Sequence, residues 1–143
     1  MATTTNRYLA YPAAAAGISR ASSGGAAWSF SAYTEVVPVS TITSNFYIAG
    51  LTWCWYTPQA AADTTYEWII EIASDTSGTP VLLIQVPSSV RADSNVGYPP
   101  SNMIIFPEPK YVAANTQLGV RVAYSLSTTS NTLTGIKIMY QIA

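Results

Sequence analysis

Residues 110–142 read KYVAANTQLGVRVAYSLSTTSNTLTGIKIMYQI, and this stretch decides the fold. Apolar residues occupy every second position from 118 to 124 and again from 136 to 142. Because successive side chains of a strand point to opposite faces of a sheet, the alternation predicts two half-buried strands. The residues between them, 127–132, are Ser, Thr and Asn, which favour turns. The stretch is therefore predicted to form an antiparallel hairpin within a larger sheet.

The same kind of signal recurs upstream and brings the expected total to about eight strands. The further predicted strands cover residues 28–30, 33–39, 46–56, 65–73, 80–86 and 103–106. Residues 87–102 are predicted to form a long irregular loop, and no segment shows a convincing helical period. The fold class is all-β, a two-sheet antiparallel β-sandwich of jelly-roll type. An immunoglobulin-like sandwich is the nearest competitor, but its Cys…Trp…Cys spacing is absent.

The first 23 residues differ from the rest because they show no alternation. They carry four large side chains that need a surface to pack on: Tyr8, Leu9, Tyr11 and Ile18. We therefore divide the chain into an extended N-terminal arm, residues 1–23, and a β-sandwich domain, residues 24–143. The arm is expected to pack along its own domain or to reach a neighbour, and to contribute more to assembly than to the fold. Deleting residues 2–20 should then leave the domain folded.

Charge is scarce over the whole chain. Charged residues make up 9% of the sequence, against about 25% in ordinary soluble proteins, and the net charge is −1. Such a surface does little to keep copies apart, which favours a homo-oligomer. The 6 Lys and Arg residues do not form the positive footprint that nucleic acids require. No apolar run approaches the roughly 18 residues of a membrane span, so neither nucleic acid nor membrane is an expected partner.

The residue inventory argues against catalysis and against a cofactor. Histidine is absent, which removes the commonest general base and metal ligand. The single cysteine, Cys54, lies in a strand-like run and is expected to be a small buried hydrophobe. Glu67 and Glu71 would lie about 13 Å apart on one strand face, too far for a glycosidase pair. We interpret that face as solvated, with Arg121 as a partner, and predict that the chain is not an enzyme and holds no cofactor or metal.

Aromatic residues suggest two kinds of surface. The tryptophans could form a sugar-stacking platform, but Trp53, Trp55 and Trp68 alternate with aliphatic residues and are expected in the core. The loop residues Tyr98, Pro99 and Pro100 are the better surface candidates, because loop aromatics are frequent interface anchors. The sequence start has no basic stretch followed by an apolar one, so no signal peptide is predicted. Synthesis in a cytoplasm is expected.

Residues 109–122, PKYVAANTQLGVRV, resemble a segment of small jelly-roll structural proteins of tailed bacteriophages. In that family a similar run enters the penultimate strand, and a Ser/Thr-rich turn leads to a final apolar strand. Residues 66–73, YEWIIEIA, with the turn at 76–79, look like a hairpin of the same family. The resemblance extends over roughly residues 44–142.

The resemblance implies a capsid decoration, or cement, protein on the outer surface of a phage head, commonly a trimer. Its partners would be copies of itself and the major capsid protein, and its location the virion. The alternative is a tail-fibre or head-fibre module that binds a receptor or carbohydrate. The residues expected to contact other subunits or the capsid are Tyr8, Leu9, Tyr11, Ile18, Tyr98, Pro99 and Pro100.

Overall fold

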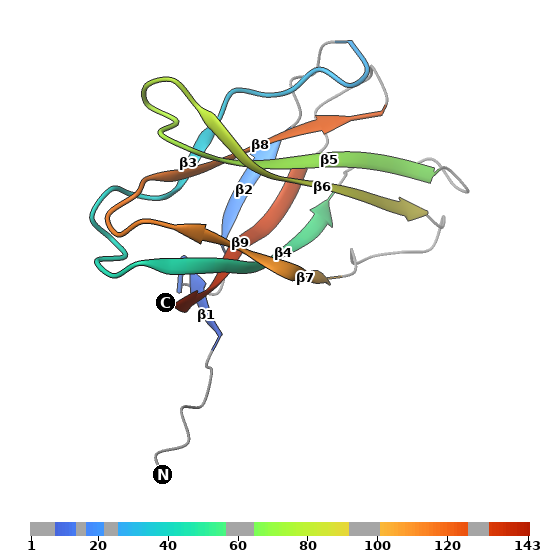
Figure 1. The fold of residues 1–143 in the computed structure, drawn as a ribbon. Helices are drawn as coiled ribbons and strands as arrows, with labels where there is room; N and C mark the ends of the chain where they lie inside the picture. Colours follow the sequence, from blue (N-terminus) through green and yellow to red (C-terminus); the bar gives the residue numbers. More distant parts are fainter. Residues whose placement is uncertain (1–7, 14–16, 22–25, 57–64, 92–100, 126–131) are drawn as a thin grey trace.

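The computed structural model describes residues 8–13, 17–21, 26–56, 65–91, 101–125 and 132–143. These residues form nine strands and no helix, arranged as two antiparallel sheets (Figure 1). The strands are β1 (Leu9–Tyr11), β2 (Ile18–Ala21), β3 (Thr34–Val37), β4 (Phe46–Tyr56), β5 (Thr65–Ser74), β6 (Val81–Arg91), β7 (Ser101–Val112), β8 (Leu118–Tyr124) and β9 (Thr132–Ile142). The predicted all-β sandwich is confirmed. In the described part of the chain no helix could cross a membrane.

The strand order is that of a jelly roll. One sheet has the order β1-β9-β4-β7, with β2 also paired to β9, and the other has the order β3-β8-β5-β6. When β1 and β2 are counted as one interrupted strand, the eight strands run 1-8-3-6 in one sheet and 2-7-4-5 in the other. Two interlocked four-stranded sheets of this kind bury their inner faces against each other and leave few exposed edges.

The core consists of the inward residues of both sheets. Its largest fully buried side chains come from β4, β5, β8 and β9: Phe46, Leu51, Trp68, Ile70, Ile72, Tyr124, Leu133, Ile136 and Ile138 among them. Trp53 is buried as well, so two of the three predicted core tryptophans are confirmed. The side chain of Trp55 lies outside the described residues. Cys54 is half-buried rather than fully buried.

The predicted terminal hairpin is wrong, although both of its strands exist. β8 pairs with β3 and β5, whereas β9 pairs with β1, β2 and β4, so the two strands lie in different sheets. Alternation reports which face of a strand is buried, and that face is the same whether the next strand joins the same sheet or the opposite one. The hairpin of β5 and β6, by contrast, forms directly.

Several strands also differ from their expected bounds. β6 continues through Pro87 to Arg91, and β7 begins at Ser101 and continues through Pro107 and Pro109. All of the expected short strand and part of the expected loop therefore belong to longer strands. Proline is tolerated here because β6 and β7 are the edge strands of their sheets. Residues 28–30, expected as a strand, are irregular, and Trp28 has a φ of 62°.

Part of the predicted arm is a strand of the fold. Residues 9–11 pair with Tyr140, Met139 and Ile138, and β2 pairs with the other half of β9. These pieces supply the hydrogen-bond partners that the edge of β9 would otherwise lack. They are three and four residues long, too short to show a period in the sequence. Residues 9–11 and 18–21 therefore pack along their own domain as strands, which is one of the two alternatives left open for the arm.

Candidate interaction surface

The two sheets present different outer faces to the surroundings. Along β5, the core residues Ile70 and Ile72 alternate with residues that point outward, and Glu71 is one of these. On β8, Arg121 stands opposite Glu71 and on the same outer face. The outer face of the β3-β8-β5-β6 sheet therefore carries charge at its centre, and the chain covers this charge with its own residues.

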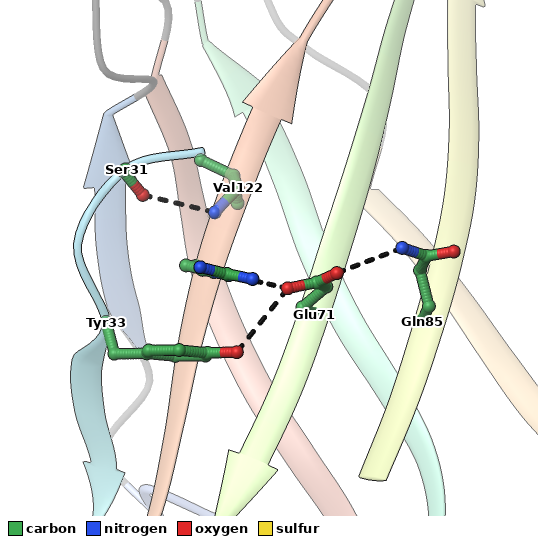
Figure 2. A network of polar contacts seen from close by, with 6 residues as sticks. Ser31, Tyr33, Glu71, Gln85 and Val122 are labelled. Atoms are coloured by element: carbon green, nitrogen blue, oxygen red, sulfur yellow. Dashed lines mark hydrogen bonds and ion pairs between the residues drawn. The ribbon is translucent and has the colours of Figure 1, made fainter. Parts of the chain in front are cut away.

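Glu71 is the central hydrogen-bond acceptor on this face, as Figure 2 shows. One carboxylate oxygen accepts from Arg121 Nε at 2.5 Å and from the Tyr33 hydroxyl at 3.4 Å. The other accepts from Gln85 Nε2 at 2.9 Å. The guanidinium of Arg121 lies 4.4 Å from the ring centroid of Phe30 and 4.7 Å from that of Tyr33. The carboxylate of Glu71 thus accepts hydrogen bonds from β8, from β6 and from the segment before β3. Glu71 is only 4% exposed.

The segment before β3 carries the two rings over this face. Ser31 N–H donates to the main-chain oxygen of Val122 at 2.9 Å, and Ser31 Oγ accepts from Val122 N–H at 3.1 Å (Figure 2). These bonds hold the segment along β8 ahead of the regular strand. Burial raises the pKa of Tyr33, with Glu71 adding to the rise and Arg121 opposing it. The arrangement keeps Tyr33 protonated as a donor to the carboxylate.

The expected solvated Glu67–Glu71 face is corrected in part. Glu67 is exposed, but Glu71 is buried because Phe30, Tyr33 and Arg121 close over it. The predicted partnership of Arg121 with this face is confirmed for Glu71. Among the described residues no three His, Cys, Asp or Glu side chains gather as metal ligands would. We therefore interpret the Glu71–Arg121 ion pair as structural, because both oxygens of the Glu71 carboxylate already accept hydrogen bonds.

The outer face of the other sheet carries large apolar side chains that are exposed. Register places three rows of residues across β9, β4 and β7 on this face: Gln141-Tyr47-Tyr111, Met139-Gly50-Ile105 and Lys137-Thr52-Met103. Residues directly opposite in an antiparallel pair share a face, and the neighbours of these residues on β4 are core residues. Of the residues in the three rows, all of them described, Lys137 alone is charged.

Four large side chains on β4 and β7 form what we call the apolar patch: Tyr47, Met103, Ile105 and Tyr111. All four are exposed, with Met103 at 64% and Tyr111 at 50%. The rings of Tyr47 and Tyr111 meet edge to face, with centroids 5.6 Å apart. Tyrosine and methionine are enriched in protein interfaces, and charged residues are depleted from interface cores. The composition of the patch is that of an interface core left open.

A bulge in the β4–β7 pair helps to shape the patch. The register shifts between Ile48 and Gly50, so that the β7 residues from Phe106 to Pro109 pass opposite a single β4 residue. A Cβ at position 50 would collide with the main-chain oxygen of Ile104. Only glycine therefore allows β7 to approach at this point, and the approach places Ile105 on the surface beside it.

Of the contact residues expected from the sequence, Tyr8, Leu9 and Tyr11 are fully described, and they lie outside the apolar patch. Tyr8 is exposed just before β1. Leu9 and Tyr11 are half-buried opposite Tyr140 and Ile138, and Tyr11 packs against the core of its own chain. Ile18 pairs through its backbone with Ile136, and its side chain lies outside the described residues. Tyr98, Pro99 and Pro100 also lie outside them.

Sequence reasoning missed the apolar patch. A signal was present, since Met103, Ile104, Ile105 and Phe106 are apolar on both faces of a strand flanked by prolines. A strand of this kind is either buried on both sides or exposes an apolar face at an edge. Only the exposure of Met103 and Ile105 in the folded chain shows that the second case holds.

Comparisons with known proteins leave the chain without a family. No family model matches it, and no curated protein matches it. Among solved structures, "Structure of Eiger TNF from S. frugiperda" aligns over 95% of this chain and 92% of that chain, with a TM-score of 0.42 and 11% sequence identity. This alignment does not assign the chain to a family.

Proposed function

We propose that this chain is a non-enzymatic structural protein of a bacteriophage virion, a decoration protein that binds the outer surface of the head as an oligomer. The observation that carries the self-associating part of the proposal is the apolar patch of Tyr47, Met103, Ile105 and Tyr111. The family resemblance of residues 109–122 and 66–79 supplies the virion part. A jelly roll whose described residues gather no metal-ligand cluster suits a molecule that acts by covering surface.

A second copy of the chain is the occupant that best suits the patch. Like charges do not oppose each other across it, because only Lys137 is charged in its three rows. Homo-oligomers are mostly symmetric, so one patch can meet its own copy or a neighbouring surface of the same chain around a closed ring. The decoration proteins that the sequence resembles are commonly trimers, and we propose a trimer here.

The magnitude favours assembly on a lattice over tight association in solution. Fully burying a large apolar side chain contributes about 1.5–3 kcal/mol, and each patch residue is already about half covered. Four such residues therefore contribute roughly 3–6 kcal/mol per copy. Association costs about 4–15 kcal/mol in lost freedom, so the patch requires contacts around its rim or a second binding surface. A capsid lattice supplies the latter by holding neighbouring copies at high effective concentration.

The oligomeric state of the purified chain tests the self-associating part. We expect sedimentation velocity between about 1 µM and 1 mM to show a concentration-dependent oligomer, and Ile105→Lys to shift it to monomer. Leu82→Lys is the matched control, because Leu82 is an exposed aliphatic residue on β6 of the other sheet. A chain that stays monomeric over the whole range, or an I105K variant that assembles as well as L82K, would refute self-association through the patch.

The location is tested on particles. Gold-labelled antibody against the chain, applied to virions of the phage that encodes it, should decorate the head in a regular array. Labelling confined to tail fibres would replace the proposed location with the fibre alternative. Absence of the chain from purified virions by mass spectrometry would reject the virion proposal as a whole.

A further inference from the structure

A pocket of about 360 Å³ lies on the outer face of β5 and β6. Its lining includes Trp28, Glu67, Ile69, Pro87, Ser88 and Ser89. Glu67 pairs with Ser89 and Ile69 pairs with Pro87, so these four residues share the outer face of the sheet. The pocket uses no residue of the Glu71–Arg121 network and none of the apolar patch. Neither the fold nor the proposed self-association accounts for it.

Trp28 is held in place at the pocket by an unusual main chain. Its φ of 62° lies in the left-handed region, which a bulky residue seldom adopts. Its N–H donates to the main-chain oxygen of Tyr124 at 2.7 Å, and Ser29 N–H donates to Ala26 at 3.1 Å. The side chain nevertheless remains 43% exposed. Such backbone strain persists where the surroundings impose it, and it is concentrated at ligand sites.

Glu67 is held equally firmly on the other side of the pocket. Its N–H donates to Ser125 Oγ at 3.2 Å, and its main-chain oxygen accepts from Ser125 N–H at 3.0 Å. The β5–β6 pairing sets Ser89 opposite it. Its side chain is exposed, in contrast to the buried carboxylate of Glu71. An indole, a carboxylate and a hydroxyl are therefore presented together on rigid backbone, which lowers the cost of ordering them around a ligand.

We propose that this pocket is a binding subsite for a neutral saccharide. The face of an indole ring is electron-rich and attracts the C–H groups on the apolar face of a sugar ring. The carboxylate of Glu67 accepts hydrogen bonds from sugar hydroxyls, and the Ser89 hydroxyl can donate or accept. Among the described residues of the lining none is cationic, which favours a neutral sugar over phosphate, sulfate and acidic sugars.

A quaternary ammonium ligand is the other chemistry that an indole and a carboxylate could take. Such ligands are held in cages of several aromatic faces, and among the described residues of the lining Trp28 is the one exposed aromatic residue. An ammonium ligand would also leave the Ser89 hydroxyl without a role. The pocket volume is near the lower end of the roughly 300–1,000 Å³ typical of ligand sites, which suits a small sugar bound weakly. Many copies on one particle would convert weak binding into avidity.

The test uses the full-length protein and defined probes. Saturation-transfer NMR is recorded with methyl glycosides of glucose, galactose, mannose and N-acetylglucosamine at millimolar concentration, and with choline as the competing probe. Trp28→Gly removes the ring while glycine keeps the left-handed backbone without strain, so the variant should fold. Val39→Ala is the control, an exposed apolar residue outside both the pocket and the apolar patch. Glu67→Gln tests the carboxylate at constant size.

We expect at least one glycoside to bind the wild-type chain and V39A equally, tenfold or more weaker binding by W28G, and intermediate binding by E67Q. The unfolding transitions of the variants, recorded in parallel, should show that W28G remains folded. The proposal is overturned if no glycoside binds, if W28G binds as well as the wild type, or if choline alone binds. These outcomes do not depend on the oligomeric state, so the subsite and the proposed self-association can fail separately.

Discussion

Removing the guanidinium of Arg121 should destabilise the fold more than its half-exposed position suggests. Arg121→Met keeps the aliphatic stem on the sheet and deletes the charge that faces Glu71. Glu71 then retains the Gln85 amide at 2.9 Å and the longer Tyr33 contact at 3.4 Å, inside an environment that leaves it 4% exposed. A buried carboxylate that loses its cation is costly because water does not replace the lost partner.

The expected loss follows from the contacts that disappear. A hydrogen bond to a charged group contributes about 1.5–3 kcal/mol, and each stacking of the guanidinium on an aromatic ring about 0.5–1 kcal/mol. The side chain of Arg121 is 34% exposed, and solvent screening reduces the total. We expect a loss of about 2–4 kcal/mol in the free energy of unfolding, measured by urea denaturation at pH 7 at concentrations where the chain is monomeric.

Two comparisons make this result decisive. Lys110→Met removes an exposed cation from β7 and should change stability by less than about 0.5 kcal/mol. Glu71→Gln combined with Arg121→Met removes both charges, and should cost less than the sum of the single changes by about 1 kcal/mol or more. A loss below about 0.5 kcal/mol for R121M, or strict additivity in the double variant, would show that the pair is not the hub inferred from the structure.

Three further outcomes are expected. Gly50→Ala should cost about 2 kcal/mol or more in thermal or urea unfolding, because its Cβ would strike the Ile104 oxygen and force β7 away; unchanged stability would contradict the bulge geometry. Because the pKa of Tyr33 is raised, the folded chain holds the hydroxyl proton more tightly than the unfolded chain does. The contribution of this proton to the free energy of unfolding is therefore present below pH ~10 and is lost as the pH rises further. In Tyr33→Phe the decline in the free energy of unfolding between pH 9 and 11 should be shallower. Deleting residues 2–20 should lower the free energy of unfolding by at least about 2 kcal/mol, since Tyr11 packs on the core, and a truncated chain of wild-type stability would restore the arm interpretation.

The two charged residues of the network show how far sequence reasoning extends. Glu71 and Arg121 could be recognised as outward-facing positions, and Arg121 as a partner for that face, because alternation assigns faces within each strand. Burial of Glu71 could not be predicted, because it depends on Phe30 and Tyr33 folding over the sheet from a segment that precedes the regular strand β3. The apolar patch was hidden for a related reason: a strand with two apolar faces has the same sequence whether its outer face is covered or open.

By itself, the sequence determined that the chain is all-β, where most of its long strands lie and which of their residues form the core. Those properties depend on period-two alternation, which is local and survives without knowledge of neighbours. Only the tertiary structure decided that β8 and β9 enter different sheets, that residues 9–11 and 18–21 complete the edge of β9, and that β7 is an edge strand. Strand partners are chosen by contacts between residues far apart in the chain, so no single stretch encodes them. The exposed patch and the Trp28 pocket both arise from those long-range choices.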